Sequence, residues 1–467
     1  PVKTRLAPSP TGSLHVGTAH TALFNFLFAR HFGGSFVIRV EDTDTERSKK
    51  EYEDNILEGL AWLGITSDER ITRQSERAEY YETLLKKLLA EGSIFYCTHS
   101  AEELEAERQK LMGEGKSPHH KCDQRETGLD SGVLRIKNNT IEPIIFSDVV
   151  RGDISFDPVT FGDFVIAKNI SAPLYNFAVA VDDHDMNITH VIRGEDHIAN
   201  TPKQIMIQRL LGFTAPLYAH IPLLLGTDRS KLSKRHGATS VSEYRDQGYL
   251  SDALFNFLAL LGWNPGTDQE IFSREGLIAE FSLDRVQKSG AIFDTTKLDW
   301  MNSEYIKKTS AHDLISYVLP FLESLEDTYG KKSDENYMAS VIAIEQSRMK
   351  KLSDISDKID YFFRTPTYDV ALLTWKNQPP EETSRALEDA RNLISSWDVT
   401  QMTKEDIERL LLEKARAYTD RGSFLWPLRV ALSGKKNSPG PFEIIAVLGK
   451  ENSLRHIDHA LTGLKSL

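Results

Sequence analysis

The sequence has few cysteines and no long apolar run. Only two of its 467 residues are cysteine, Cys97 and Cys122, which excludes the disulfide framework of small secreted proteins. No apolar segment reaches the roughly 18 residues that a membrane-spanning helix needs. The first residues, PVKTRLAPSP, have prolines and polar groups where a secretory signal is apolar. We therefore expect a cytoplasmic protein that has no membrane partner.

The common nucleotide-binding motifs are missing as well. The chain contains neither GxxxxGK[ST] nor GxGxxG, and it has no internal repeat or low-complexity segment. Its net charge of −12 does not favour nucleic acid, although binding depends on local basic patches rather than on the sum. The length suggests roughly three domains of about 150 residues each. Any nucleotide site must therefore use a less common motif.

The N-terminal segment predicts a strand, a helix and a second strand. Residues 3–7 alternate as a short strand does, and apolar residues recur at helical spacing over 14–31. Gly33 and Gly34 end this helix, and the alternation resumes in SFVIRVED. Such a unit implies a parallel sheet, whose ligands bind at the carboxyl ends of the strands. Residues 7–17 and 41–44 are expected at that edge.

After the first βαβ unit, the pattern of predicted elements changes at about residue 97 and again at about residue 240. A helix-rich stretch over 52–90 is followed, over about 97–172, by a charged helix mixed with short strands such as GVLRIK and DFVIAK, which indicates an insertion. The segments YNFAVAVDD and ITHVIRGEDH then predict strands, and a helix, the strand HIPLLL and the loop GTDRSKLSKRHG follow. After about residue 240, helical spacing dominates.

Two short motifs suit a phosphate ligand. His15 and Gly17 open the first helix, where unpaired N–H groups and the helix dipole favour phosphate, and glycine lets a flat base approach. The segment KLSKR, Lys231 to Arg235, lies between two glycines in a loop and suits a mobile clamp on a polyphosphate. Alone, the first motif fits a helix cap and the second a solvated basic loop.

Together, these motifs resemble the paired HIGH and KMSKS signatures of class I aminoacyl-tRNA synthetases. Longer segments occur in the order seen in bacterial glutamyl-tRNA synthetases: RLAPSPTGSLHVGTA, RVEDTDTERS, YNFAVAVDDHDMNITHVIRGEDHIANTPKQ, KLSKRHGATSV and KLDWMN. The resemblance covers the N-terminal two thirds closely. The related glutaminyl enzymes typically read PPEPNGxLHIGH and RFDDTN at the first two places, so the motifs favour glutamate.

The resemblance implies an α/β N-terminal catalytic domain of the Rossmann type, as in class I synthetases, interrupted by an insertion. The catalytic domain is expected over residues 1–95 and 172–240, and an inserted α+β acceptor-stem-binding domain over 96–171. All-α domains are expected to follow. They are a helical stem-contact domain over 241–308 and an anticodon-binding domain over 309–467.

The resemblance also implies a two-step reaction. ATP, accompanied by Mg²⁺, activates L-glutamate to glutamyl-adenylate, and the glutamyl group passes to the 3′-terminal adenosine of tRNA(Glu). The implied catalytic residues are His15 and Lys234. The implied ATP-binding residues are His15, Gly17, Lys231 and Lys234.

Recognition of glutamate needs cations for two carboxylates and an anion for the ammonium group. By resemblance, Arg5 and Tyr175 face the side-chain carboxylate and Arg193 pairs with the α-carboxylate. The residues expected around the ammonium group are Ala7, Ser9 and Glu41.

Two features concern tRNA and metal. Arg348, in the basic segment QSRMKK, lies where relatives place an arginine that helps to read the anticodon. Some bacterial relatives hold zinc with a Cys-x-Cys and a Cys-x-His pair, and others hold none. A Cys₂His₂ set, Cys97, His99, His120 and Cys122, fits a tetrahedral zinc ion in this chain, and the sequence leaves zinc open.

Two alternative functions are compatible with much of this resemblance. A catalytically silent, tRNA-binding paralogue is disfavoured because both signature motifs are intact. A short relative that glutamylates a modified tRNA base lacks the C-terminal anticodon domain, whereas this chain continues well beyond KLDWMN. Family members usually act as monomers. The sequence does not decide whether tRNA(Gln) is also glutamylated.

Overall fold

The first strand, helix and strand form the predicted parallel unit. In the computed structural model, which describes residues 1–322 and 335–466, β1 (Lys3–Leu6) pairs in parallel with β2 (Ser35–Val40). Helix α1 (Val16–His31) connects them and ends just before Gly33, whose φ of 61° suits glycine. A short strand, β3 (Thr72–Arg73), continues the sheet beyond β2.

Two later strands extend this arrangement on the other side of β1. The amide of Thr189 donates to the carbonyl of Lys3 (2.9 Å), which places β10 (His190–Gly194) beside β1. Strand β11 (Leu217–Ile221) then pairs in parallel with β10. The spatial order β3-β2-β1-β10-β11 is that of a doubly wound sheet, and the order reverses between β1 and β10. A ligand crevice is expected at that point, outside the carboxyl ends.

Helices accompany these strands. They are α2 (Lys50–Trp62), α3 (Ala78–Ala90), α5 (Tyr175–Asp185) and α6 (Thr201–Leu211). The segment YNFAVAVDD forms α5, so its prediction as a strand was wrong. Every residue from 177 to 183 is buried, and a helix buried on all sides shows no polar stripe from which its period could be recognised.

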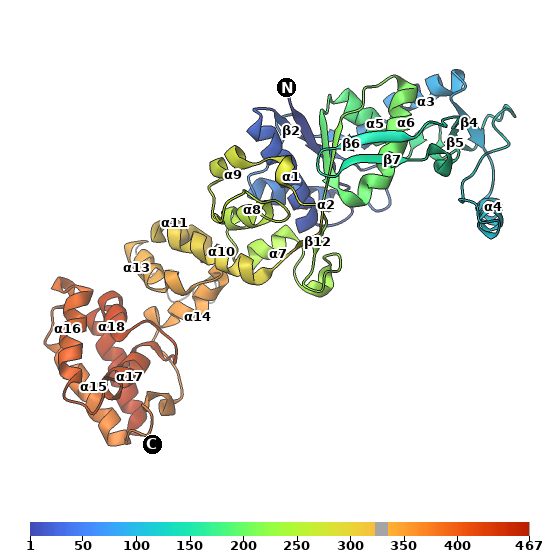
Figure 1. Cartoon of the computed structure of the whole chain (residues 1–467). Helices are drawn as coiled ribbons and strands as arrows, with labels where there is room; N and C mark the ends of the chain where they lie inside the picture. The colour runs from blue at the N-terminus through green and yellow to red at the C-terminus, as the bar shows by residue number, and fades with distance from the viewer. Residues whose placement is uncertain (323–334, 467) are drawn as a thin grey trace. The chain divides into compact units, whose positions relative to one another are not determined.

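The expected insertion, residues 96–171, contains the charged helix α4 (Ala101–Gly113) and the middle of an antiparallel sheet, whose two outer strands cross or lie beyond these bounds. The strands of that sheet are β4 (Ile94–Cys97), β5 (Val133–Ile136), β8 (Val165–Asn169) and β9 (Ala172–Pro173). A hairpin of β6 (Ile144–Asp148) and β7 (Gly152–Phe156) joins the sheet of β10 and β11, with Asp148 opposite Tyr218 (Figure 1). Part of the insertion therefore reaches the main sheet.

A loop over residues 226–237 follows β12 (Leu224–Leu225). The remaining elements of this part are α7 (Val241–Asp246), α8 (Ser251–Ala259), α9 (Arg274–Glu280) and β13 (Ala291–Ile292), which pairs with β12. The chain divides here: one compact unit comprises residues 1–245 and 251–295, and the other comprises 246–250 and 296–467.

The second unit is helical. Its helices are α10 (Thr295–Lys308), α11 (Ala311–Val318), α13 (Glu335–Glu345), α14 (Ser356–Ile359), α15 (Pro380–Ser395), α16 (Lys404–Ala415), α17 (Arg421–Ser433) and α18 (Pro441–Leu464). Helices α15 to α18 pack together (Figure 1). Leu387, Leu411 and Phe424 of these helices are fully buried.

The predicted fold class, an α/β N-terminal part followed by all-α parts, is confirmed. Residues 323–334 and 467, which belong to the expected anticodon domain, lie outside the described residues. Among the helices that are described, none is both long and apolar enough to cross a membrane.

Candidate active site

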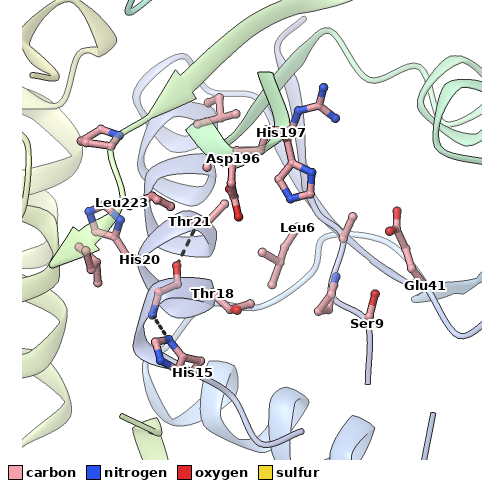
Figure 2. Close-up of a pocket in the computed structure, with 18 of the residues that line it drawn as sticks. Leu6, Ser9, His15, Thr18, His20, Thr21, Glu41, Asp196, His197 and Leu223 are labelled. Carbon is pink, nitrogen blue, oxygen red and sulfur yellow. Dashed lines mark hydrogen bonds between the residues drawn. The ribbon is translucent and has the colours of Figure 1, made fainter. Parts of the chain in front are cut away.

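A cavity of about 510 Å³ lies at the carboxyl ends of β1 and β10, where the strand order reverses. The predicted glutamate-binding residues all line it: Arg5, Ala7, Ser9, Glu41, Tyr175 and Arg193. Three of the predicted ATP-binding residues, His15, Gly17 and Lys231, line it as well. Figure 2 shows His15, Thr18 and Thr21 along α1 on one side and Glu41 on the other. Segments far apart in the sequence therefore share one cavity.

His15 caps the first turn of α1. Its Nδ1 accepts a hydrogen bond from the amide of Gly17 (2.9 Å; Figure 2). Burial and the charge of Lys231 lower the pKa of His15, so the ring is neutral at pH 7 and its proton is on Nε2. A side chain at residue 17 would bring its Cβ within 3.1 Å of His15 Nδ1, so glycine leaves room for the ring. The Nε2–H group can donate to a phosphate oxygen.

Main-chain hydrogen bonds connect the end of the basic loop to the start of α1. The amide of Val16 donates to the carbonyl of Thr239 (2.8 Å), and the amide of Val241 donates to the carbonyl of Leu14 (2.9 Å). These bonds tie the residues that follow the KLSKR segment to the HVGT segment. Two motifs more than two hundred positions apart in the sequence thus lie at one helix end.

The two lysines of the KLSKR segment occupy different positions. Lys231 lines the cavity, and its Nζ lies 3.5 Å from a carboxylate oxygen of Asp196. Lys234 begins a 3₁₀ turn and is exposed, and it is not among the described residues that line the cavity. Asp228 holds the loop together by accepting hydrogen bonds from Ser230 and His236. Lys234 therefore needs a change of side-chain or loop conformation to reach a ligand.

Arg193 is buried beside the cavity with only neutral partners. Its Nε donates to His220 Nε2 (3.2 Å), its Nη1 to Gln204 Oε1 (2.9 Å) and its Nη2 to Thr201 Oγ1 (2.7 Å). Within residues 1–322 and 335–466, no carboxylate oxygen lies close enough to pair with it. The relative exposure of Arg193 is 5%. Its positive charge is therefore available to an anionic ligand.

Arg5 differs because its charge is already balanced. Its Nε and Nη2 donate to the two carboxylate oxygens of Asp183 (2.9 and 3.2 Å). Arg39, which is completely buried, donates to Asp183 (2.6 Å) and to Glu41 (3.0 Å). Burial alone raises the pKa of Asp183, but the two guanidinium groups outweigh this effect and bring it to about 2. Asp183 therefore stays ionised and fixes the orientation of Arg5.

Glu41 places a carboxyl group at the cavity wall. Burial raises its pKa, and the neighbouring Arg39 opposes that rise. One of its carboxylate oxygens bonds to Arg39, which leaves the other for a ligand. An ammonium group is the matching partner.

Sequence reasoning missed several residues of this site. His197 lines the cavity, and its Nδ1 lies 3.1 Å from the hydroxyl oxygen of Tyr175. Burial and the nearby Arg193 lower the pKa of His197 to about 4. Asp196 and His197 follow Arg193 closely in RGEDH, which is a signal that reasoning could have used. Asp183 was hidden because its segment was assigned to a strand.

A Cys/His cluster that fits a metal ion lies at the end of β4. The ligand atoms of Cys97, His99, His120 and Cys122 all lie within 4.8 Å of one another. Both cysteines are buried, and the buried Nε2 of His120 has no hydrogen-bond partner in the described part of the chain. Two sulfurs and two imidazoles are a common tetrahedral donor set. An ion at this place accounts for the unpartnered nitrogen.

Arg348 belongs to the second unit. It ends a 3₁₀ turn (Gln346–Arg348), and its Nε lies 3.7 Å from a carboxylate oxygen of Glu345. Its charge also contributes, after burial, to lowering the pKa of Arg429. Arg348 and Arg429 therefore lie close enough for their charges to interact.

Comparison with known families gives the class of the protein. Residues 1–300 match the family described as tRNA synthetases class I (E and Q), catalytic domain. Residues 313–461 match the family described as an anticodon binding domain. The chain therefore belongs to the class I tRNA synthetases.

Comparison with individual proteins narrows the family within this class. A glutamate–tRNA ligase of Thermoanaerobacter pseudethanolicus is 43% identical over 100% of this chain and 99% of its own length. A glutamate–tRNA ligase of Carboxydothermus hydrogenoformans is 43% identical over 98% of this chain and 99% of its own length. The crystal structure of a glutamate tRNA ligase from Elizabethkingia meningosepticum, in complex with its amino acid, has a TM-score of 0.86 and 30% identity over 99% of both chains. The chain belongs to the glutamate–tRNA ligases.

Proposed function

We propose that the protein activates L-glutamate with ATP to glutamyl-adenylate and transfers the glutamyl group to the 3′-terminal adenosine of tRNA(Glu). The observation that carries this proposal is Arg193. A guanidinium group that is 5% exposed, faces a cavity and has only neutral partners in the described chain is a built site for a carboxylate. The α-carboxylate of the amino acid is proposed to fill that site.

The charges around the cavity also fit the rest of the substrate. Glu41 has an oxygen free for the ammonium group, and Ala7 and Ser9 line the wall nearby. Arg5 keeps some of its N–H donors beyond those bound to Asp183, and with Tyr175 it is placed to take the side-chain carboxylate. We propose these roles for the glutamate-binding residues.

Activation requires positioning and charge neutralisation more than proton transfer. The α-carboxylate, which is ionised at pH 7, attacks the α-phosphorus of ATP, and pyrophosphate leaves. His15 Nε2–H and the amides at the start of α1 take the phosphates, and Gly17 leaves room for adenine. Lys231 and Lys234 then balance the charge that develops on the leaving group. Mg²⁺ enters with ATP.

The remaining parts are proposed to serve tRNA. Residues 96–171 bind the acceptor stem, 241–308 contact the stem and 309–467 bind the anticodon, with Arg348 among the contacts. The catalytic domain comprises 1–95 and 172–240. The enzyme is proposed to act as a monomer in the cytoplasm.

We also propose that Cys97, His99, His120 and Cys122 hold a structural zinc ion. This set contains no open position of the kind that a catalytic zinc needs, since four protein ligands complete the tetrahedron. The ion would fasten the segment that follows α4 to the end of β4, and no chemical step depends on it.

The experiment is aminoacylation with ATP, radiolabelled amino acid and purified tRNA(Glu) or tRNA(Gln). Glutamate is expected to be attached to tRNA(Glu), and aspartate and glutamine are not. Arg193→Met is expected to raise the KM for glutamate strongly, whereas Arg209→Met, on the exposed side of α6, is not. The absence of glutamate attachment to either tRNA would refute the proposal. Charging of both tRNAs would extend it to tRNA(Gln).

A further inference from the structure

A buried chain of three side chains leads from the cavity wall to the β6–β7 hairpin. Arg193 Nε donates to His220 Nε2 (3.2 Å), and His220 Nδ1 donates to Asp148 Oδ2 (2.6 Å). His220 is completely buried, and Asp148 is 3% exposed. Water cannot replace a lost partner at such a place, so each proton in the chain has a defined position.

The partners of Asp148 decide where the proton of His220 lies. The carboxylate oxygen Oδ1 accepts from the amides of Val150 (3.0 Å) and Arg151 (2.9 Å), and Oδ2 accepts from the amide of His220 (3.0 Å). An ionised carboxylate can only accept, so Nδ1 of His220 must carry the proton. Its Nε2 then has a lone pair that the N–H group of Arg193 (3.2 Å) shares with the hydroxyl group of Thr201 (3.1 Å). Burial lowers the pKa of His220, which keeps the ring neutral.

This arrangement orients Arg193 without neutralising it. Arg5 touches the carboxylate of Asp183 directly and is balanced by it. Arg193 reaches the carboxylate of Asp148 only through a neutral imidazole. A guanidinium group has five N–H donors, and neutral acceptors take three of those of Arg193, which leaves two for a ligand.

Resting on the proposed function, we propose that Asp148 and His220 are positioning residues for the glutamate carboxylate that Arg193 binds. Asp148 fixes the tautomer of His220, and His220 holds Arg193 in place while its positive charge stays open to the substrate. Asp148 ends β6, within residues 96–171. The segment proposed to bind the acceptor stem therefore also completes the amino-acid site.

Asp148→Asn tests this inference because it changes charge and donor pattern but little volume. The amide oxygen is expected at the Oδ1 position, where it keeps two backbone partners. The NH₂ group then faces His220 Nδ1, so the imidazole proton moves to Nε2 and opposes the N–H of Arg193. We expect the KM for glutamate to rise roughly 10- to 100-fold. The KM for ATP is expected to stay within about twofold, because the proposed function places the phosphates at the start of α1 and not at Arg193.

The assay is ATP–pyrophosphate exchange in the presence of tRNA(Glu), with separate KM values for glutamate and ATP. His220→Gln can still donate to Asp148 and accept from Arg193, so it should keep the KM for glutamate within about threefold of wild type. His220→Leu can do neither and should resemble Asp148→Asn. The matched control is Asp153→Asn, because Asp153 is an exposed residue of β7 that bonds to Ser147. Thermal unfolding checks that each variant folds.

The inference is supported if the KM for glutamate rises selectively in Asp148→Asn and His220→Leu and stays near the wild-type value in His220→Gln. An unchanged KM in Asp148→Asn, or an equal rise for glutamate and ATP, overturns it. If Asp148→Asn does not fold, the contrast between His220→Gln and His220→Leu decides in the same way. Wild-type protein that shows no exchange with glutamate would instead refute the proposed function, so the two failures are distinct.

Discussion

Replacing Asp183 by asparagine perturbs the charge network beneath the cavity. This buried carboxylate accepts hydrogen bonds from Arg5 (2.9 and 3.2 Å) and Arg39 (2.6 Å). Its pKa is about 2 in the folded protein, against about 3.9 in an unfolded chain, which corresponds to roughly 2–3 kcal/mol of stability. Removing one partner of a buried ion pair costs about 3–5 kcal/mol. We expect the variant to lose about 3 kcal/mol.

Urea denaturation of the full chain, followed by circular dichroism, measures this loss. The matched control is Asp185→Asn, because Asp185 lies on the same helix but pairs with Arg77 near the surface, where its side chain is 41% exposed. Such a pair contributes no more than about 1 kcal/mol. In Asp183→Asn, the KM for glutamate should also rise because Arg5 loses its orientation. Equal stability of the two variants would refute the reasoning.

The same network predicts a pH dependence with a definite sign. Because folding depresses the pKa of Asp183, its contribution is complete above the unfolded value of about 3.9 and is lost as the pH falls towards about 2. The free energies of unfolding of wild type and Asp183→Asn should therefore differ most at neutral pH and converge as the pH falls from about 4 to about 2. A difference that stays constant over this range would contradict the assigned pKa.

The other predictions concern the loop, the metal and tRNA. Lys234→Ala should slow glutamyl-adenylate formation by roughly 100-fold or more in single-turnover assays and leave thermal unfolding unchanged, whereas Lys87→Ala, on the exposed face of α3, should change neither the rate nor thermal unfolding. Cys122→Ser should abolish stoichiometric zinc, measured by elemental analysis, and lower the melting temperature; equal zinc content in wild type and variant would argue against the cluster. Arg348→Ala should raise the KM for tRNA roughly tenfold and leave that for glutamate unchanged, and the reverse pattern would remove it from tRNA binding.

The N-terminal unit and its ligand edge could be predicted from sequence because their signals are local. The length of the apolar run that forms α1, the glycine that follows it and the alternation of β2 depend on neighbouring residues alone. The rule that ligands bind at carboxyl ends then placed His15 and Glu41 at one edge. The close spacing of the Cys97 and Cys122 pairs likewise marked a metal candidate.

Contacts between distant residues were beyond such reasoning. Asp148 and His220 are 72 positions apart, and only the pairing of β6 with β11 brings them together. Helix α5 is buried on all sides, so its apolar run has no period that distinguishes it from a strand. Because α5 was assigned to a strand, the ion pairs of Asp183 with Arg5 and Arg39 were not predicted. Asp183 contacts Arg5 directly, Asp148 reaches Arg193 through His220, and neither carboxylate lines the cavity itself. They form no recognisable sequence motif.

The central claim is that one cavity holds glutamate against Arg193 and ATP against the start of α1. A crystal structure of the full chain with glutamyl-sulfamoyl-adenosine, a stable analogue of glutamyl-adenylate, tests it most directly. We expect the acyl carbonyl, which replaces the α-carboxylate, to face Arg193, the side-chain carboxylate to lie on Arg5, the ammonium group on Glu41 and the sulfamoyl group beside His15. Analogue bound elsewhere, or bound with its glutamyl part away from Arg193, would contradict the account.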